Sequence, residues 1–191
     1  MRISGGQLKG RKTASQKAFS KKNEGDELRP TSAKVREAVF DILRDAVDHA
    51  SFLDLYAGTG TVGLEALSRG SDRTYFVEDS RLRACLLRDT LAKIGLADRA
   101  TVYQEQALDF MRRASRSGLR FDIIFADPPY ASEDMQKIVA LIDEHGLLKE
   151  GGRLIIEHSS RTALPDDAPT LRLVKNYKYG DTMLTLYRKE P

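Results

Sequence analysis

Short apolar runs alternate with amphipathic stretches along the chain from residue 51 onwards. The runs SFLDLY, RTYFVED, ATVYQE and FDIIFA are typical of strands and lie at residues 51–56, 73–79, 100–105 and 121–126. The stretches between them place apolar residues three or four positions apart, which predicts helices over 61–70, 80–94 and about 106–115. Strands that alternate with helices form a mostly parallel sheet with helices on both faces. We therefore predict a Rossmann-like α/β fold.

Elements at both ends extend this prediction. Val35, Val39 and Ile42 share one helical face, so we expect a helix over 32–47, and Ser132 begins another after the fourth strand. RLIIEH at 153–158 is a fifth strand. LRLVKNYKY at 171–179 and TMLTLYRK at 182–189 are joined by Gly180-Asp181, which is typical of a hairpin turn. The expected sheet has seven strands and ends in an antiparallel C-terminal hairpin.

The composition fits one ordinary globular domain of 191 residues, with 41% hydrophobic and 31% charged side chains. No apolar run approaches the ~18 residues of a membrane-spanning helix, and the first residues lack the apolar core of a secretory signal. One cysteine, Cys85, and three scattered histidines provide no metal-ligand spacing. We expect a cytoplasmic protein with no metal and no membrane partner.

Charge is unevenly distributed. Residues 1–30 hold eight basic and three acidic side chains, a net charge of +5, whereas the whole chain carries +3. We therefore divide the chain into a basic N-terminal arm (1–30) and a near-neutral domain (31–191). A basic segment on such a body is typical of proteins that bind phosphates, although a solvated tail with no partner has the same composition.

The turn after the first predicted strand indicates a nucleoside-containing cofactor. Gly58, Gly60 and Gly63 fit the pattern G-x-G-x-x-G, in which glycines allow a tight turn close to a ligand. Glu78 ends the next strand, where a carboxylate can accept both hydroxyl hydrogens of a ribose. Asp54 precedes the turn and suits an ammonium group better than a diphosphate. This choice favours S-adenosylmethionine over NAD.

The tetrad Asp127-Pro128-Pro129-Tyr130 follows the fourth strand and is the sharpest chemical signal in the chain. Two prolines stiffen the loop and leave its carbonyls free to accept hydrogen bonds. Asp127 adds a carboxylate acceptor and Tyr130 an aromatic face, a combination that suits a planar base with an exocyclic amine. Hydrogen bonds from that amine to Asp127 and to the Pro128 carbonyl would free its lone pair for in-line attack on a sulfonium methyl group.

These motifs resemble the class I S-adenosylmethionine-dependent methyltransferases, and more narrowly the bacterial RsmD family, which methylates the exocyclic N2 amine of one guanine in 16S rRNA. The matching stretches span nearly the whole chain: ISGGQLKGRK (3–12), RPTSAKVREAVFDIL (29–43), FLDLYAGTGTVGLEALSRG (52–70), FVEDS (76–80), FDIIFADPPY (121–130) and YGDTMLTLYRK (179–189). The resemblance implies a class I methyltransferase domain over 31–191, with 16S rRNA, within the small ribosomal subunit or an assembly intermediate, as partner.

The resemblance also implies roles for individual residues. The residues implied to bind the cofactor are Asp54, Tyr56, Gly58, Gly60, Glu78, Asp79, Gln106, Ala107, Arg29 and Thr31. Those implied to hold the target base are Asp127, Pro128, Pro129 and Tyr130. We expect RNA contacts from Lys9, Arg11, Lys12 and Arg36. Many relatives in the wider class have Asp where this chain has Gln106, and the lysine-rich arm after Arg11 is longer than the family pattern.

Three other interpretations stay open on the sequence alone. An adenine or cytosine amino-methyltransferase would use the same tetrad, an NAD-dependent oxidoreductase would use the glycine turn, and a non-enzymatic RNA-binding protein would use the basic arm. We expect Cys85 to be a buried small hydrophobe. His158 lies near the catalytic edge, but a packing role is expected to outweigh a chemical one.

Overall fold

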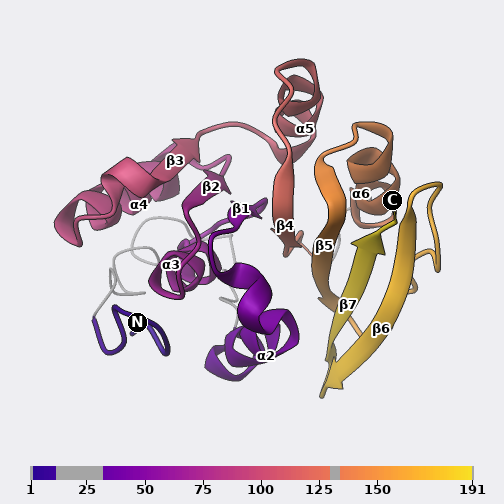
Figure 1. The fold of residues 1–191 in the computed structure, drawn as a ribbon, viewed down its shortest axis with the longest axis horizontal. Helices are drawn as coiled ribbons and strands as arrows, with labels where there is room; N and C mark the ends of the chain where they lie inside the picture. Colours follow the sequence, from indigo (N-terminus) through magenta and orange to yellow (C-terminus); the bar gives the residue numbers. More distant parts are fainter. Residues whose placement is uncertain (1, 12–31, 130–133, 191) are drawn as a thin grey trace.

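The computed structural model describes residues 2–11, 32–129 and 134–190 (Figure 1). Its centre is a seven-stranded sheet in the order β3-β2-β1-β4-β5-β7-β6. Strands β1 to β5 are parallel, and β7 runs antiparallel between β5 and β6. The strands are β1 (Ser51–Asp54), β2 (Arg73–Val77), β3 (Ala100–Tyr103), β4 (Phe121–Ala126), β5 (Leu148–Ser159), β6 (Leu171–Tyr179) and β7 (Thr182–Lys189). The predicted sheet and its closing hairpin are confirmed.

Helices cover both faces of this sheet. The helices are α2 (Ala33–Leu43), α3 (Thr61–Ser68), α4 (Arg81–Lys93), α5 (Ala107–Arg116) and α6 (Asp134–Glu144), with short 3-10 turns η1 (Arg44–Val47) and η2 (Ala97–Arg99). Two apolar clusters lie between the sheet and α2, α3 and α4, and a third lies between the sheet and α5 and α6. This arrangement follows from the right-handed βαβ connections, which place helices on one face while the chain runs from β1 to β3 and on the other face once the strand order reverses.

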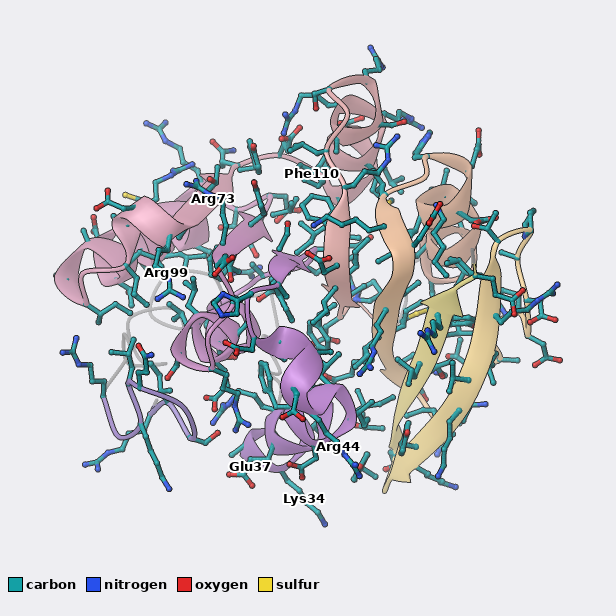
Figure 2. All side chains as sticks on the ribbon, viewed as in Figure 1. Lys34, Glu37, Arg44, Arg73, Arg99 and Phe110 are labelled. Carbon is teal, nitrogen blue, oxygen red and sulfur yellow. The ribbon has the colours of Figure 1, made fainter. Side chains whose placement is uncertain are left out.

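The core shows why these residues form strands. In β4, Ile123 and Phe125 belong to the cluster beneath α2, whereas Ile124 and Ala126 belong to the cluster beneath α5 and α6. Because side chains alternate along a strand, an unbroken apolar run is the pattern of a strand buried on both faces. Phe110 of α5 lies over this layer, with its ring centroid 5.1 Å from that of Tyr103 (Figure 2).

Most element boundaries lie within two residues of the predicted ones, and the larger differences are at two elements. The helix predicted over 32–47 is regular only to Leu43, because Arg44 adopts a positive φ of 48° and the chain continues as η1. Strand β5, predicted over 153–158, begins at Leu148, since the chain keeps pairing with β4 across an irregularity at its start. Ser32 caps α2: the Val35 N–H donates to Ser32 Oγ at 3.1 Å.

The first part of the predicted basic arm is packed on the domain. Residues 2–11 fold into a closed loop, in which the Gly10 N–H donates to the Ile3 carbonyl at 2.9 Å. Ile3 is buried, and the Gln7 N–H donates to the Ser68 carbonyl of α3 at 2.7 Å. Residues 12–30 of the arm lie outside the described residues.

Candidate active site

Three predicted acidic residues meet at the carboxyl edge of the sheet. Asp54 ends β1, Glu78 follows β2 and Asp127 follows β4, and β1 lies between β2 and β4. The strand order reverses between β1 and β4, because the chain moves outward to β2 and β3 before returning to β4. In open α/β sheets, ligands bind outside the carboxyl ends of the strands at this reversal. The fold therefore brings the glycine turn and the tetrad to one place.

The glycine turn links β1 to α3 in a conformation that needs glycine. Gly58 and Gly60 have φ values of 52° and 71°. A Cβ at Gly60 would clash with Leu87 Cδ1 of α4, so a larger residue there would force the buried Leu87 side chain to shift. Both the backbone conformation and the close packing of α4 thus favour glycine at position 60.

Asp54 is a buried carboxylate at the base of this turn, with 2% of its surface exposed. Its Oδ2 accepts the Gly63 N–H of α3 at 2.9 Å. The pKa of Asp54 is raised to about 7, chiefly by burial, and the negative charges of Asp127 and Glu78 act in the same direction against the Gly63 hydrogen bond. A cation bound near these three carboxyl groups would favour the charged form of Asp54, so the arrangement suits a cationic ligand.

Glu78 holds the glycine turn through a hydrogen bond to its backbone. Its Oε2 accepts the Gly58 N–H at 2.7 Å, and its Oε1 accepts the Ser80 N–H at 2.9 Å. Burial is the main cause that raises the pKa of Glu78. Arg83 of α4 lies 3.4 Å from Glu78 Oε1, a contact that the sequence pattern did not predict, although Arg83 lies in the first turn of the helix after Glu78.

The described part of the tetrad lies beside these acids. Asp127 is partly exposed, Pro128 is buried and Pro129 is exposed. Leu55 donates its N–H to the Phe125 carbonyl at 2.9 Å, which fixes the end of β4 against the end of β1. Tyr130 lies outside the described residues. A partly exposed carboxylate on a proline-stiffened strand end is able to accept hydrogen bonds from a substrate.

The remaining predicted cofactor residues line the same edge. Gln106 is exposed at the N-terminus of α5, and Ala107 is buried in its first turn. Asp79 is exposed next to Glu78, and Tyr56 is half-buried next to the glycine turn. Arg29 and Thr31 lie outside the described residues.

The predicted RNA contacts fall into two groups. Lys9 and Arg11 are exposed on the N-terminal loop, and the Arg11 guanidinium donates to the Ile94 carbonyl at 3.1 Å. Arg36 instead is 3% exposed, and its Nε lies 3.6 Å from Glu65 Oε2. The structure thus places Arg36 in an internal ion pair rather than on an open surface. Lys12 lies outside the described residues.

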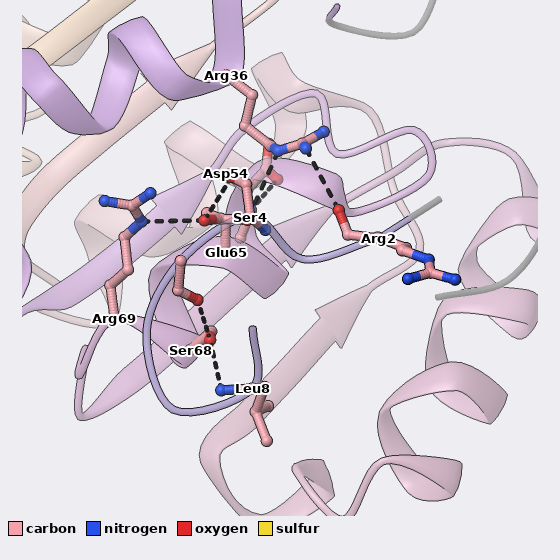
Figure 3. Close-up of polar contacts among 10 residues, drawn as sticks. Arg2, Ser4, Leu8, Arg36, Asp54, Glu65, Ser68 and Arg69 are labelled. Atoms are coloured by element: carbon pink, nitrogen blue, oxygen red, sulfur yellow. Dashed lines mark hydrogen bonds and ion pairs between the residues drawn. The ribbon is translucent and has the colours of Figure 1, made fainter. Parts of the chain in front are cut away.

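Glu65 is the centre of a polar network that the sequence pattern did not predict (Figure 3). This fully buried carboxylate accepts the Ser4 N–H and hydroxyl, each at 2.8 Å, and the Arg69 Nε–H at 3.0 Å. The Arg36 guanidinium also donates to the Arg2 carbonyl at 3.3 Å. The network joins the N-terminal loop, α2 and α3. The available signal was a charged residue in a helix whose other positions are apolar or small.

Two residues outside the site also bear on the predictions. Cys85 is exposed on α4, so the expectation of a buried thiol is wrong: it lies on the solvent face while Ala84 and Leu87 face the core. His158 is buried, with its Nε2 2.7 Å from Thr185 Oγ1 and its Nδ1 2.9 Å from the Ser159 carbonyl. These contacts give His158 a packing role, as expected.

Comparison with known proteins identifies the family. The family described as Conserved hypothetical protein 95 matches residues 1–188. The chain is 34% identical over 189 residues to "Putative rRNA methyltransferase YlbH" of Bacillus subtilis, covering 99% of each chain. It is 30% identical over 190 residues to "Ribosomal RNA small subunit methyltransferase D" of Escherichia coli, covering all of this chain and 90% of that one. The chain belongs to the RsmD family of methyltransferases.

Solved structures agree with this membership. A structure titled "Putative methyltransferase yhhF from Escherichia coli" superposes with a TM-score of 0.84 at 28% identity, covering 100% of this chain and 98% of that one. An RNA methyltransferase from Salinibacter ruber, solved with S-adenosyl-L-homocysteine, has a TM-score of 0.64 at 15% identity over 84% and 94% of the two chains. The second likeness shows the shared class I methyltransferase fold.

Two kinds of feature are absent from the described residues. No helix among them is long and apolar enough to cross a membrane. No cluster of three or more His, Cys, Asp or Glu side chains in these ranges is arranged to hold a metal ion.

Proposed function

We propose that this RsmD-family protein transfers a methyl group from S-adenosylmethionine to the exocyclic N2 amine of a guanine in 16S rRNA. The observation that carries the proposal is the meeting of Asp127, at the end of β4, with Asp54 and the glycine turn at the end of β1. A base acceptor and a cation-binding acid therefore lie at neighbouring strand ends. The name of the E. coli relative supports an rRNA substrate in the small subunit.

The residues present fit S-adenosylmethionine. Its ammonium and sulfonium groups are cations, and the buried Asp54, with a pKa raised to about 7 beside two further carboxylates, supplies complementary charge. Gly58 and Gly60, both at positive φ, present no side chain to a ligand. In this proposal Glu78 holds the ribose, and Gln106 and Ala107 contact the adenine. Two anionic phosphates of NAD would meet the same three acids unfavourably.

The protein's own groups orient the target amine and accept its proton. When bound, S-adenosylmethionine would supply a methyl carbon for the amine lone pair to attack, and its sulfur would keep the electron pair of the broken bond. Asp127 and the Pro128 carbonyl accept the two amine hydrogens, which orients the lone pair toward the cofactor. Asp127 is then placed to accept the proton that the methylated nitrogen loses. Catalysis by this arrangement rests on positioning and charge.

The test uses small ribosomal subunits from cells that lack this protein. Incubation with methyl-labelled S-adenosylmethionine, followed by nucleoside analysis, is expected to give label in N2-methylguanosine. Label in a methylated adenosine or cytidine would overturn the guanine assignment but retain amine methylation. Absence of both label and cofactor binding would overturn the proposed reaction.

Asp127→Asn is expected to reduce kcat at least about 100-fold, because an amide holds the amine less strongly and cannot accept its proton. The affinity for S-adenosylmethionine should change by less than about threefold. Asp122→Asn is the matched control: Asp122 lies on β4 at the opposite edge, where it binds the Ser51 N–H at 2.8 Å and Lys149 at 2.7 Å. Normal turnover by Asp127→Asn, measured with single-turnover kinetics, would contradict the assigned role.

A further inference from the structure

We propose that the tip of the β6–β7 hairpin is a docking surface for the single-stranded RNA that flanks the target base. The hairpin tip is defined here as residues 175–183 together with Ser160 and Arg161, which lie against the turn through the Ser160 N–H bond to the Asp181 carbonyl at 2.8 Å. This inference rests on the proposed function, because it assigns part of the substrate surface for that reaction.

The register of the strands places the tip beyond the active site. Ala126, the last residue of β4, pairs with Ile156 of β5. Strand β5 continues to Ser159, which pairs with Thr182 of β7. Three further residues extend a strand by about 10 Å. In Figure 1 the tip points the same way as the carboxyl ends of β4 and β5 and lies near α2. The tip therefore projects past Asp127, on the side where the RNA must approach.

The side chains of the tip combine positive charge with aromatic rings. Lys175 and Lys178 are exposed on β6, and Arg161 is exposed beside the turn. Lys175 Nζ lies 5.1 Å from the ring centroid of Tyr177. Tyr177 and Tyr179 pack against the α2 cluster but remain partly exposed. Cations that follow the phosphates and rings on which bases stack are the chemistry of single-strand binding.

The tip is also tied firmly to the sheet. His158 of β5 lies 2.7 Å from Thr185 Oγ1 of β7, and the Thr185 hydroxyl donates to Asn176 Oδ1 of β6 at 2.6 Å. His158 and Thr185 are both buried. A polar chain across three strands fixes their relative positions at the level where the hairpin leaves the sheet. Bases that stack on such a surface would meet a preformed site.

Charge favours RNA over a protein partner. The tip contains three cations and one carboxylate, that of Asp181. Within the described residues none of the three cations is paired with a carboxylate. They are therefore available to displace counterions from phosphates, which is the main source of RNA affinity.

The test compares two double variants of the same hairpin. Lys175→Ala with Lys178→Ala removes two cations from the tip. Arg172→Ala with Arg188→Ala is the control, because this cross-strand pair lies at the opposite end of the hairpin. The tip variant should raise KM for small subunits about tenfold, with kcat and the affinity for S-adenosylmethionine unchanged. The control should change KM less than about twofold.

Direct binding of a labelled single-stranded oligouridylate makes the test independent of methylation. The tip variant should lower the slope of log affinity against log salt by about 1.4, because each phosphate contact contributes about 0.7. Tyr179→Ala should weaken this binding, and Tyr179→Phe should restore it, since the ring provides the stacking surface. A loss of binding limited to the tip variants supports the docking surface even if no label reaches guanosine.

Three outcomes would overturn the inference. Equal effects of the tip and control variants would show that net charge, rather than the tip, binds RNA. Unchanged oligouridylate binding with loss of a cross-link to a ribosomal protein would assign the tip to a protein partner. A selective loss of duplex binding would show that the tip follows a helix instead of a single strand.

Discussion

At the residue scale, the fold disfavours the charged form of the Asp54 carboxyl group. A carboxylate that is almost fully buried between Asp127 and Glu78 has a pKa raised to about 7. The folded protein therefore binds more protons than the unfolded chain between about pH 4 and pH 7, so stability falls as pH rises through that range. In the proposed function, the cation of the cofactor offsets this disadvantage. The proposal therefore implies that stability without the cofactor is lower so that affinity for it is higher.

Asp54→Asn is expected to raise the thermal midpoint at pH 8. The amide oxygen still accepts the Gly63 N–H, while the buried charge is lost, and the gain is on the order of 2–4 kcal/mol. At pH 5 the gain should be much smaller, because the wild-type carboxyl is then largely protonated. Thermal unfolding followed by circular dichroism at both pH values measures this difference. An equal gain in stability at both pH values would mean that burial of the charge is not the cause. The same substitution should also lower the affinity for S-adenosylmethionine at pH 8.

At the scale of elements, the glycine turn joins three pieces of structure. It ends β1, begins α3 and packs against Leu87 of α4, whose side chain occupies the space that a Cβ at Gly60 would need. A change in this turn consequently alters the packing of α4. Under the proposed function, it also alters the surface that binds the cofactor.

Gly60→Ala is expected to weaken cofactor binding at least about tenfold and to destabilise the fold by about 2–4 kcal/mol, through overpacking and positive φ together. Gly95→Ala is the matched control, since Gly95 has a φ of 73° but a Cβ added there would meet no atom within 4 Å. That variant should cost only about 1–2 kcal/mol and leave cofactor affinity unchanged. Calorimetric titration and denaturant unfolding separate the two effects. Equal losses of affinity in both variants would argue against a specific role for the turn.

Sequence patterns predicted the elements well, because strands buried on both faces carry unbroken apolar runs. The run FDIIFA, for example, is β4 without a shift at either end. The patterns predicted less well those element boundaries that tertiary contacts determine. Strand β5, for example, begins at Leu148 because β4 lies alongside it. For the site, glycine spacing and strand ends located Asp54, Glu78 and Asp127. Arg36 was assigned to RNA because its partner Glu65 is distant in sequence and gives no local signal.

At the scale of the whole molecule, the N-terminal loop of residues 2–11 is part of the folded domain. Ser68 of α3 accepts the Leu8 N–H at 2.9 Å and donates to the Gly5 carbonyl at 2.6 Å. Together with Glu65, these contacts fix the loop, with its exposed Lys9 and Arg11, on α3. The start of the chain and α2 are both held by one buried carboxylate. Displacement of the loop should consequently lower the stability of the whole domain, which loss of a basic tail would not do.

Gly6→Ala tests this coupling. Gly6 has a φ of 73°, and an added Cβ would meet the Ser68 carbonyl oxygen, a backbone atom that cannot move aside. The loop must then leave α3, which exposes Ile3 and separates Ser4 from Glu65. We expect a loss of about 3 kcal/mol or more, from overpacking and from a buried ion pair left without its full set of partners. Unfolding should remain a single transition.

Gly10→Ala provides the comparison within the same loop. Its φ of 86° is also positive, but a Cβ there meets nothing within 4 Å, so only backbone strain of about 1–2 kcal/mol is expected. Urea unfolding of both variants and the wild type gives the difference directly. If Gly6→Ala lost no more stability than Gly10→Ala, the loop would be a dispensable appendage. Both variants carry the backbone strain of a positive φ, and only Gly6→Ala adds a clash with the Ser68 carbonyl. A larger loss of stability in Gly6→Ala would therefore show that contact with α3 makes the first residues part of the domain.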